Sequence, residues 1–418
     1  MANCFSIWQP MPPLLLESGG VEVALGVEWA LWGVTGLVSL PIAMLAIECL
    51  VGGLLPGFGR SPSTAGWRRP RVAVLVPAHN EAASIGTTIQ AIQPQLQPGD
   101  RLLVVADNCT DATAELARSA GATVAERFNT EQRGKGYALD FGVQVLAQEP
   151  PEVVVIVDAD CTLEPGSLER LGQWALKYDR PVQGRYLMEL PPSPSAARRV
   201  SAFAFAVKNF ARSEGLRRLG LPCLLNGTGM AFPWQAIAQL PLASGNLVED
   251  MQMGIDLTVA GSPPLFCPDA PVTGRLPQAE SAATSQRTRW EHGHLQTMIS
   301  VVPPLLGRAI RTGNGPLLVM GLDLLVPPLS FLVMIWVGAA IAVTGVGALV
   351  GRWQPAIGMG VLGLVLFGAI SLAWWRVGRP FLSARMLLMI PLYVLQKVPI
   401  YLGFLKRRQT EWVRTERD

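Results

Sequence analysis

Long apolar stretches at both ends of the chain constrain its fold more than any other feature. Residues 29–55 are almost entirely apolar, and residues 316–376 hold two further apolar stretches. A bilayer core of about 30 Å requires about 20 apolar helical residues, which each stretch can supply. These segments predict a chain anchored in a membrane at both ends, with residues 70–295 between the anchors as a separate domain.

The first apolar stretch is better explained as a membrane span than as a cleaved secretion signal. A signal peptide begins with basic residues, whereas no Lys or Arg precedes Arg60. Basic residues follow the stretch at once, and such residues stay on the cytosolic side. We therefore expect residues 1–28 to be extracytoplasmic and the middle domain to lie in the cytosol. The expected location is a bacterial inner or plasma membrane. The basic residues are Arg60, Arg68, Arg69 and Arg71.

The C-terminal third returns to the membrane in several pieces. Residues 296–313 combine apolar positions with two prolines and two arginines, which predicts an interfacial helix. Within residues 316–376, a proline pair separates a leading piece from a span near residues 329–350. A second span fits residues 355–375.

The last apolar segment, residues 386–405, has Lys397 near its middle. A lysine at the centre of a bilayer costs about 2.5–3.5 kcal/mol. Basic residues also stand on both sides of the segment, so both flanks are expected in the cytosol. We predict an interfacial or re-entrant segment followed by a basic cytosolic tail at residues 406–418. A fourth full span with an exterior tail is the alternative.

Net charge and cysteine content exclude two classes of function. A formal net charge of +3 over 418 residues is too small to indicate a nucleic-acid partner. The six cysteines include no CxxC pair, so neither a disulfide framework nor a zinc site is indicated.

The middle domain alternates short β-rich runs with helical patterns. This alternation predicts an α/β fold in which a mostly parallel sheet is covered by helices on both faces. Ligands in such sheets bind beyond the carboxyl ends of the strands. The runs are Val72–Val76, Leu102–Val105 and Val153–Val157, and the helical patterns include Ser84–Leu96 and Asp111–Ala120.

Polar clusters follow the predicted strands at those carboxyl ends. Mg²⁺ and Mn²⁺ prefer oxygen ligands and often bridge carboxylates to substrate phosphates. The Asp158-Ala159-Asp160 pair therefore predicts a metal–phosphate site, although such a pair also occurs in ordinary turns. The clusters comprise Pro77, His79, Asn80 and Glu81 after the first strand, Asp107 after the second, and Asp158 and Asp160 after the third.

Two further motifs carry charges that a transfer reaction needs. Glu249 and Asp250 precede a helical pattern, and a carboxylate there could accept the proton of an attacking hydroxyl. The alternative is an acidic pair that only stabilises the helix N-terminus. Lys135 stands between two glycines, which permits close approach to a phosphate, although the P-loop spacing is absent.

The end of the middle domain offers groups for a sugar and a diphosphate. Arg289 could pair with diphosphate oxygens, Trp290 could stack on a sugar ring, and Gln286 could bind its hydroxyls. The alternative is a basic entry into the membrane interface, where Trp and Arg are common. The turn Asn226-Gly227-Thr228 is either structural or shapes the acceptor side.

In this order, the motifs resemble those of the membrane-integrated family-2 glycosyltransferases, which include cellulose, chitin and hyaluronan synthases and ceramide glucosyltransferase. The resemblance covers about residues 75–290. It implies a glycosyltransferase-A (Rossmann-like) catalytic domain with helical transmembrane and interfacial segments. It also implies a UDP-sugar donor, Mg²⁺ or Mn²⁺, and an inverting single displacement.

The resemblance further implies roles for individual residues. The Pro77–Glu81 turn and Asp107 would hold the nucleotide, and Lys135 would contact the diphosphate. Asp158 and Asp160 would engage the diphosphate and its metal, and Asp250, beside Glu249, would be the general base. Gln286, Arg289 and Trp290 would bind the donor diphosphate and the acceptor end.

Two acceptors remain open. The motif Gln286–Trp290 favours a growing extracellular polysaccharide or oligosaccharide. The small membrane part favours a lipid acceptor such as a ceramide, a diacylglycerol or a polyprenyl phosphate. The larger relatives have more spans, so polymer export here would involve an export partner or a homo-oligomer. A non-catalytic membrane scaffold is the alternative from a different class of protein.

Overall fold

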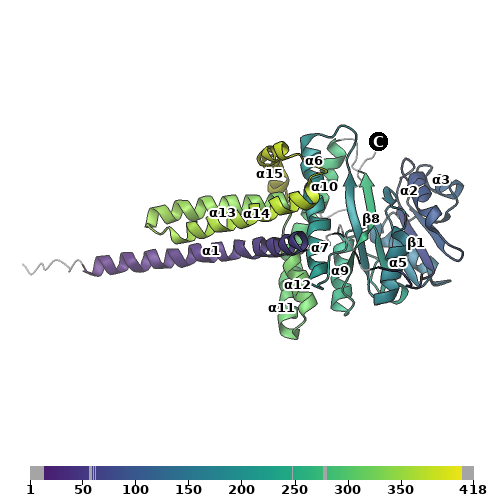
Figure 1. Cartoon of the computed structure of the whole chain (residues 1–418), viewed down its shortest axis with the longest axis horizontal. Coiled ribbons are helices and arrows are strands. Elements are labelled where there is room, and N and C mark those ends of the chain that lie inside the picture. The colour runs from purple at the N-terminus through teal and green to yellow at the C-terminus, as the bar shows by residue number, and fades with distance from the viewer. Residues whose placement is uncertain are drawn as a thin grey trace, which may run out of the picture.

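The computed structural model describes residues 14–55, 59, 61, 63–246, 248–275 and 280–406. The expected extracytoplasmic segment up to residue 13, Arg60, and the basic tail from residue 407 lie outside these residues. Figure 1 shows an α/β domain from which three long helices, α1, α13 and α14, project side by side. The structure thus has an α/β domain and a bundle of long helices, and the assignment of the bundle to a membrane stays a prediction.

The described part of the α/β domain contains an eight-stranded mixed sheet in the order β3-β2-β1-β4-β7-β6-β8-β5. The strands β3, β2, β1 and β4 are parallel to one another, as are β6 and β8. The strand bounds are β1 Val72–Ala78, β2 Arg101–Asp107, β3 Thr123–Arg127, β4 Val153–Ile156, β5 Cys161–Leu163, β6 Val182–Glu189, β7 Met230–Pro233 and β8 Leu265–Arg275.

Helices cover both faces of this sheet, which confirms the predicted α/β class. Side chains of β1 alternate between the faces, so that Val74 joins the apolar layer that contains Ile89 of α2, and Leu75 joins the layer that contains Leu139 of α4. The helices of the domain are α2 Ile85–Ile92, α3 Thr113–Ser119, α4 Lys135–Leu146, α5 Ser167–Tyr178, α6 Ala196–Ala206, α7 Ser213–Arg218, α8 Trp234–Ile237, α9 Glu249–Val259 and α10 Glu280–Ser300. A 3₁₀ turn, η1 (Gln93–Gln95), and a π-helix, η2 (Val207–Arg212), extend α2 and α6.

The sheet is less parallel than the sequence predicts. The strand β7 runs antiparallel to both β4 and β6, and β5 runs antiparallel to β8. All four residues of β7 are buried, so its sequence has no polar–apolar alternation that would reveal a strand. One residue separates the turn Asn226-Gly227-Thr228 from β7, so the antiparallel pairing of β7 with β4 places this turn beside the end of β4.

Four of the described helical segments are long and apolar enough to cross a membrane. The helix α1 begins at Leu14, well before the expected start at residue 29. The spans expected near residues 329–350 and 355–375 correspond to α13 and α14, and a short π-helix, η3, follows α14. The bounds are α1 Leu14–Leu54, α13 Leu329–Val350, α14 Gln354–Ala373, η3 Trp374–Gly378, η4 Ala384–Met389 and α15 Ile390–Lys406.

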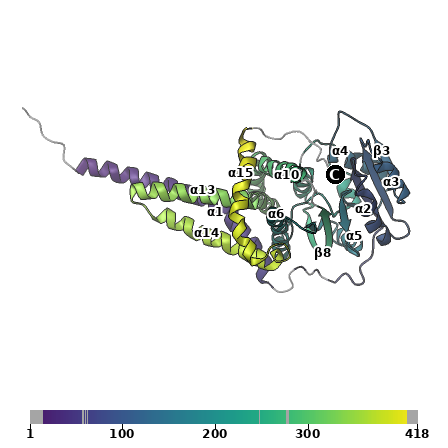
Figure 2. The same cartoon turned by 90° about the horizontal axis from the view of Figure 1, so that it is seen from above.

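Shorter helices run across the three long ones at the junction with the α/β domain. The sequence predicts one interfacial helix at residues 296–313. In the structure, the first residues of this segment end α10, and most of the others form a separate helix, α11 (Val302–Thr312). The helices α11 and α12 (Gly315–Leu324) pack against each other at this junction in Figure 1. Figure 2 shows α15 lying across the bases of α13 and α14 rather than along them.

The polar centre of α15 is buried against the α/β domain. Lys397 is only 4% exposed and forms an ion pair with Glu291 of α10. This pair explains how a lysine is accommodated within an apolar helix, because its charge is compensated by a carboxylate. The interfacial or re-entrant placement of residues 386–405 relative to the bilayer stays a prediction.

Candidate active site

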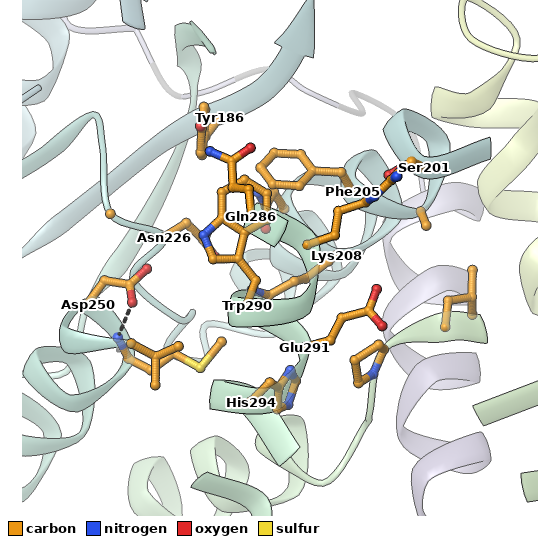
Figure 3. A pocket seen from close by; sticks show the side chains of 18 of the residues that line it. Tyr186, Ser201, Phe205, Lys208, Asn226, Asp250, Gln286, Trp290, Glu291 and His294 are labelled. Atoms are coloured by element: carbon orange, nitrogen blue, oxygen red, sulfur yellow. Dashed lines mark hydrogen bonds between the residues drawn. The ribbon is translucent and has the colours of Figure 1, made fainter. Parts of the chain in front are cut away.

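A cavity of about 260 Å³ lies between the end of β4, the α9 N-terminus and α10. It brings together ten of the residues singled out in the sequence, which come from five separate segments of the chain. Figure 3 shows several of them around the cavity. The ten are Lys135, Asp158, Asp160, Asn226, Gly227, Glu249, Asp250, Gln286, Arg289 and Trp290.

Lys135 contacts several groups at the polar end of this cavity. It stands in the first turn of α4, and its Nζ forms an ion pair with Asp158 and donates a 2.7 Å hydrogen bond to the carbonyl of Gly227. The Glu249 carboxylate lies 3.8 Å from the same nitrogen. Burial alone would lower the pKa of Lys135, but the neighbouring carboxylates outweigh it and raise the pKa above its ordinary value. Lys135 is therefore a fixed positive charge.

The Asn226–Thr228 turn fixes the geometry between β4 and α9. The hydroxyl of Thr228 accepts a 3.0 Å hydrogen bond from the backbone N–H of Asp158. The side-chain oxygen of Gln183 on β6 accepts a 2.8 Å hydrogen bond from the N–H of Asn226. Its amide nitrogen donates a 3.0 Å hydrogen bond to the carbonyl of Thr228. Thr228 is fully buried, so it supports Asp158 rather than lining the cavity.

Glu249 and Asp250 occupy the first turn of α9, where the helix dipole favours negative charge. One oxygen of Asp250 accepts a 2.9 Å hydrogen bond from the N–H of Met251, as Figure 3 shows. Burial raises the pKa of Glu249 to about 7, with Lys135 opposing and Asp250 adding to the shift. The two carboxylates thus differ: Glu249 faces Lys135, and Asp250 lies against the glycine of the turn.

The acidic end of the cavity has the donor set for a divalent cation. Ligand atoms of Asp158, Asp160 and Cys161 all lie within 4.8 Å of one another. Burial raises the pKa of the Cys161 thiol well above its ordinary value, which keeps it protonated and unsuited to Mg²⁺ or Mn²⁺. The two aspartates fit such a cation, because their carboxylates supply the oxygen ligands it prefers.

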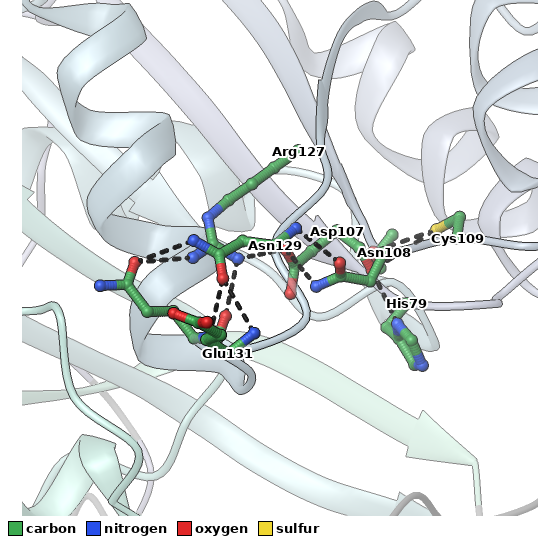
Figure 4. A network of polar contacts seen from close by, with 9 residues as sticks. His79, Asp107, Asn108, Cys109, Arg127, Asn129 and Glu131 are labelled. Atoms are coloured by element: carbon green, nitrogen blue, oxygen red, sulfur yellow. Dashed lines mark hydrogen bonds and ion pairs between the residues drawn. The ribbon is translucent and has the colours of Figure 1, made fainter.

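The residues expected to hold the nucleotide form a separate polar network at the ends of β1, β2 and β3, drawn in Figure 4. Asp107 forms a 2.6 Å ion pair with Arg127, and the ring of His79 contacts the Asp107 carbonyl at 2.6 Å. Asn80 has a left-handed backbone (φ 53°), and its side-chain oxygen accepts from the N–H of Thr110. These residues shape a loop cluster and do not line the cavity.

Other members of the nucleotide motif are engaged in local structure. The N–H of Glu81 donates to Thr113 at 2.8 Å, and its carboxylate accepts a hydrogen bond from Ser84 at 2.7 Å. Pro77 lies within β1. Arg127 belongs to the same network but was not singled out in the sequence, because the single arginine ending β3 belongs to no motif.

The helix α10 carries the last motif into the cavity. Gln286 and Trp290 are four residues apart and so lie on one face of the helix. The Trp290 ring packs against Phe205 of α6, with ring centroids 5.9 Å apart. His292 and His294 have structural contacts, to the carbonyls of Ile400 and Leu324. Burial lowers the pKa of His294 to about 4, so it is uncharged at neutral pH.

The cavity continues beyond the predicted motifs towards the apolar helices. Its further lining includes Leu45 of α1, the residues that begin α13, and Tyr393 of α15. Lys208 and Asn209 of the π-helix η2 also line it. These residues were missed in the sequence because they belong to no recognisable spacing, and only the fold brings them to the cavity.

Comparison with known families decides the affiliation. Residues 70–293 match the family described as glycosyltransferase like family 2. The chain belongs to this family. The match covers the α/β domain and ends within α10, three residues after Trp290.

Curated relatives agree with this assignment over part of their length. The chain is 25% identical over 240 residues to a probable glycosyltransferase, YdaM, of Bacillus subtilis, covering 54% of this chain and 55% of that protein. It is 31% identical over 151 residues to beta-monoglucosyldiacylglycerol synthase of Synechocystis, covering 34% of this chain and 30% of that protein. The chain thus spans about half or less of the length of these relatives.

A solved structure confirms the fold over most of the chain. The mannosyltransferase PcManGT of Pyrobaculum calidifontis, solved with GDP-mannose and Mn²⁺, superposes with a TM-score of 0.51 at 21% identity. The superposition covers 89% of this chain and all of the other. The family-2 glycosyltransferase therefore has the expected glycosyltransferase-A domain together with apolar helices that could span a membrane.

Proposed function

We propose that this family-2 glycosyltransferase transfers a sugar from a UDP-sugar to a lipid acceptor at the cytosolic face of a membrane, with inversion at the anomeric carbon. The observation that carries the proposal is the continuity of one cavity. Its acidic end is formed by Asp158 and Asp160, and its other end by Leu45, Leu329 and Tyr393 on the apolar helices. A lipid whose tails lie among those helices would present its head group to the carboxylates.

Asp250 is the proposed general base. It lies in the first turn of α9, and its Oδ2 lies near Gly227, on the side of the turn that faces Lys135 and Asp158. In the proposed step, an acceptor oxygen attacks the anomeric carbon from the face opposite the diphosphate and passes its proton to Asp250. The bond from the anomeric carbon to the diphosphate oxygen breaks, and UDP leaves.

Positive charge stabilises the departing diphosphate. Lys135, held by Asp158 and the Gly227 carbonyl, provides a fixed ammonium near the leaving oxygens. Arg289 lines the same cavity and adds a second cation. A Mg²⁺ or Mn²⁺ ion held by Asp158 and Asp160 would supply Lewis-acid neutralisation of the diphosphate. The nucleotide itself is proposed to rest on the loop cluster of His79, Asn80, Glu81 and Asp107.

Transfer to a growing polysaccharide is the second candidate. It is favoured by Trp290, whose ring lines the cavity four residues beyond Gln286 and could stack on an acceptor sugar. An export partner or a homo-oligomer would then be needed to move the polymer.

The experiment uses the full chain purified into lipid nanodiscs with Mn²⁺ and a panel of radiolabelled UDP-sugars and GDP-mannose. Asp250→Asn should lower transfer by about 10²- to 10⁴-fold, because the base is lost. Asp256→Asn on the same helix is the matched control and should retain activity, since its carboxylate accepts a hydrogen bond from Gln252 and does not line the cavity. Solvent-extractable product of a single size supports the lipid acceptor, whereas a size ladder of water-soluble product contradicts it. Full activity in Asp250→Asn would refute the mechanism.

A further inference from the structure

The π-helix η2 places two polar side chains at the wall of the cavity. Lys208 and Asn209 are consecutive and both line it. A π-helical turn widens the backbone and redirects side chains, and such turns frequently occur at functional sites. Figure 3 shows Lys208 among the lining side chains, together with Trp290 and Glu291.

The amide of Asn209 is buried without a partner. The residue is 1% exposed, and neither its Oδ1 nor its Nδ2 forms a hydrogen bond with any described residue. A buried polar group without a hydrogen bond is costly, and such groups are rare in native proteins. An unsatisfied donor and acceptor that line a cavity indicate that a ligand completes them.

Lys208 also lacks a protein partner. Within the described residues, no hydrogen bond or ion pair reaches its ammonium group, although the cavity contains several carboxylates. Two of those carboxylates are directed elsewhere: Glu291 pairs with Lys397, and Asp158 pairs with Lys135. Asp323, which does not line the cavity, pairs with Arg212. Asp250 acts on Lys208 only at a distance, and burial lowers the pKa of Lys208 below its ordinary value. An anion at this position would supply the missing countercharge.

Lys208 lies within electrostatic range of Asp250, the proposed base that takes the proton of the acceptor. The donor end already has its own cation, Lys135, bound to Asp158. Lys208 and Asn209 instead share the cavity wall with Leu45 and Pro328 at the apolar helices. Because Asp250 acts on the acceptor and Lys135 already serves the diphosphate, a charge bound at Lys208 is assigned to the acceptor.

We propose that Lys208 and Asn209 form a phosphate-binding subsite that selects a lipid acceptor carrying a phosphate group. The ammonium of Lys208 and the amide N–H₂ of Asn209 donate to phosphate oxygens, and the Asn209 carbonyl accepts from a neighbouring hydroxyl of the head group. This inference rests on the proposed lipid acceptor and names its class.

The test measures binding, so it does not depend on knowing the donor sugar. Dihexanoyl phosphatidic acid and dihexanoylglycerol share the same tails and differ by the phosphate. Titration calorimetry of the detergent-purified full chain, with UDP and Mn²⁺ present, should show at least about tenfold tighter binding of the phosphatidic acid. Lys208→Met should remove that preference, and Asn209→Leu should reduce it.

Controls separate this subsite from general effects. Lys208→Arg should keep most of the preference because it retains the charge. Lys177→Met should leave binding unchanged, because Lys177 belongs to α5 and lies over the ring of Trp67, away from the cavity lining. Melting temperatures and UDP affinity of each variant report on the fold and on the donor site.

Several results would overturn the inference. Equal binding of the two lipids by the wild type would do so, as would an unchanged preference in Lys208→Met. Weaker UDP binding in Lys208→Met would assign the lysine to the donor instead. Inorganic phosphate that binds as tightly as the lipid would show a site for a free anion. Failure of the proposed function is distinguishable, because it would appear as an absence of sugar transfer by the wild type.

Discussion

At the scale of single residues, Gly227 has an unusual backbone conformation and lies beside two residues with proposed catalytic roles, Asp250 and Lys135. Its φ of +87° lies in the left-handed region, which non-glycine residues rarely adopt. A Cβ here would lie 3.5 Å from both Asp250 and Lys135, which is ordinary contact. The difficulty of a side chain at this position therefore comes from the backbone and not from a clash.

We expect Gly227→Ala to lower the free energy of unfolding by about 1–2 kcal/mol and to reduce sugar transfer as well. Transfer falls because relaxation of the turn moves the carbonyl that holds Lys135. Gly166→Ala is the matched control: its φ is +81° with open space around it, at the start of α5. It should lose similar stability but keep activity. Equal activity in the two variants would contradict the role given to the turn.

Asp100 gives a prediction for acid stability. Burial alone would raise its pKa, but hydrogen bonds from Arg69 and from the N–H groups of Val72 and Gln97 outweigh it, so its pKa lies below the ordinary value. A depressed pKa contributes stability that is complete above about pH 4 and is lost as the pH falls through the folded-state value. Asp100→Asn should therefore lower the free energy of unfolding by about 1–3 kcal/mol at pH 7.

Thermal unfolding of the detergent-purified chain between pH 3 and 7 checks this prediction. The difference between wild type and Asp100→Asn should shrink below about pH 4, because the wild-type carboxylate also becomes neutral there. Glu189→Gln at the exposed pair with Arg275 serves as control and should change stability by about 1 kcal/mol or less. A difference that is independent of pH would contradict the assignment.

The residues at the polar end of the cavity were predictable because they belong to short motifs at the ends of strands and helices. Once the chain folds as an α/β domain, these motifs lie at one edge of the sheet, which brings together Asp158, Lys135 and Asp250. Lys208 and Asn209 had no such signal, since a lysine in a helical pattern normally faces water. Their role depends on which carboxylates are already paired, and that information is tertiary.

At the scale of elements, a buried ion cluster joins the helices α1 and α12 to the α/β domain. Arg212 at the end of η2 pairs with Glu48 of α1 at 2.6 Å and with Asp323 of α12. All three side chains are at most 6% exposed. The cluster fixes how η2, and therefore Lys208 and Asn209, is oriented relative to the first long helix.

Arg212→Met should destabilise the protein by about 3–5 kcal/mol, because two buried carboxylates lose their shared cation. Arg170→Met is the control, since its contact with Asp269 is 3.7 Å long and Arg170 is 42% exposed. That pair should contribute about 1 kcal/mol or less. Thermal unfolding in detergent measures both variants, and equal destabilisation would refute a special role for the cluster.

The predictability of elements followed the strength of their patterns. The strands β1, β2 and β4 are continuous apolar runs and were located to within a few residues. The short β7 was missed, because its residues Met-Ala-Phe-Pro lack the β-branched run that marks the equally short β4. The α15 segment was recognised as anomalous from Lys397, but its explanation lies in Glu291, 106 residues earlier.

At the scale of the whole molecule, the far end of the helical bundle gives a test of orientation. The turn between α13 and α14 lies beside α1, where Arg352 contacts Glu28 at 3.4 Å. The α/β domain is at the opposite end in Figure 1. If the domain is cytosolic, this turn must face outwards.

In intact bacterial cells, Trp353→Cys should be labelled by a membrane-impermeant maleimide, because Trp353 is 52% exposed at this turn. Tyr178→Cys on α5, at a position 41% exposed, should be labelled only after permeabilisation. The unsubstituted chain gives the background from the native cysteines. Labelling of Tyr178→Cys in intact cells would place the α/β domain outside and contradict the orientation read from Arg68, Arg69 and Arg71.

The buried Arg212–Glu48 pair has a consequence for biosynthesis. Glu48 leaves the ribosome 164 residues before its partner. At about 5–20 residues per second, α1 therefore waits roughly 8–33 s with an uncompensated carboxylate. Neither α1 nor the nascent domain can reach its final state alone, so insertion and folding must finish together. A chain truncated before η2 would keep an orphan acidic helix, a feature by which membrane quality control could distinguish incomplete copies from finished enzyme.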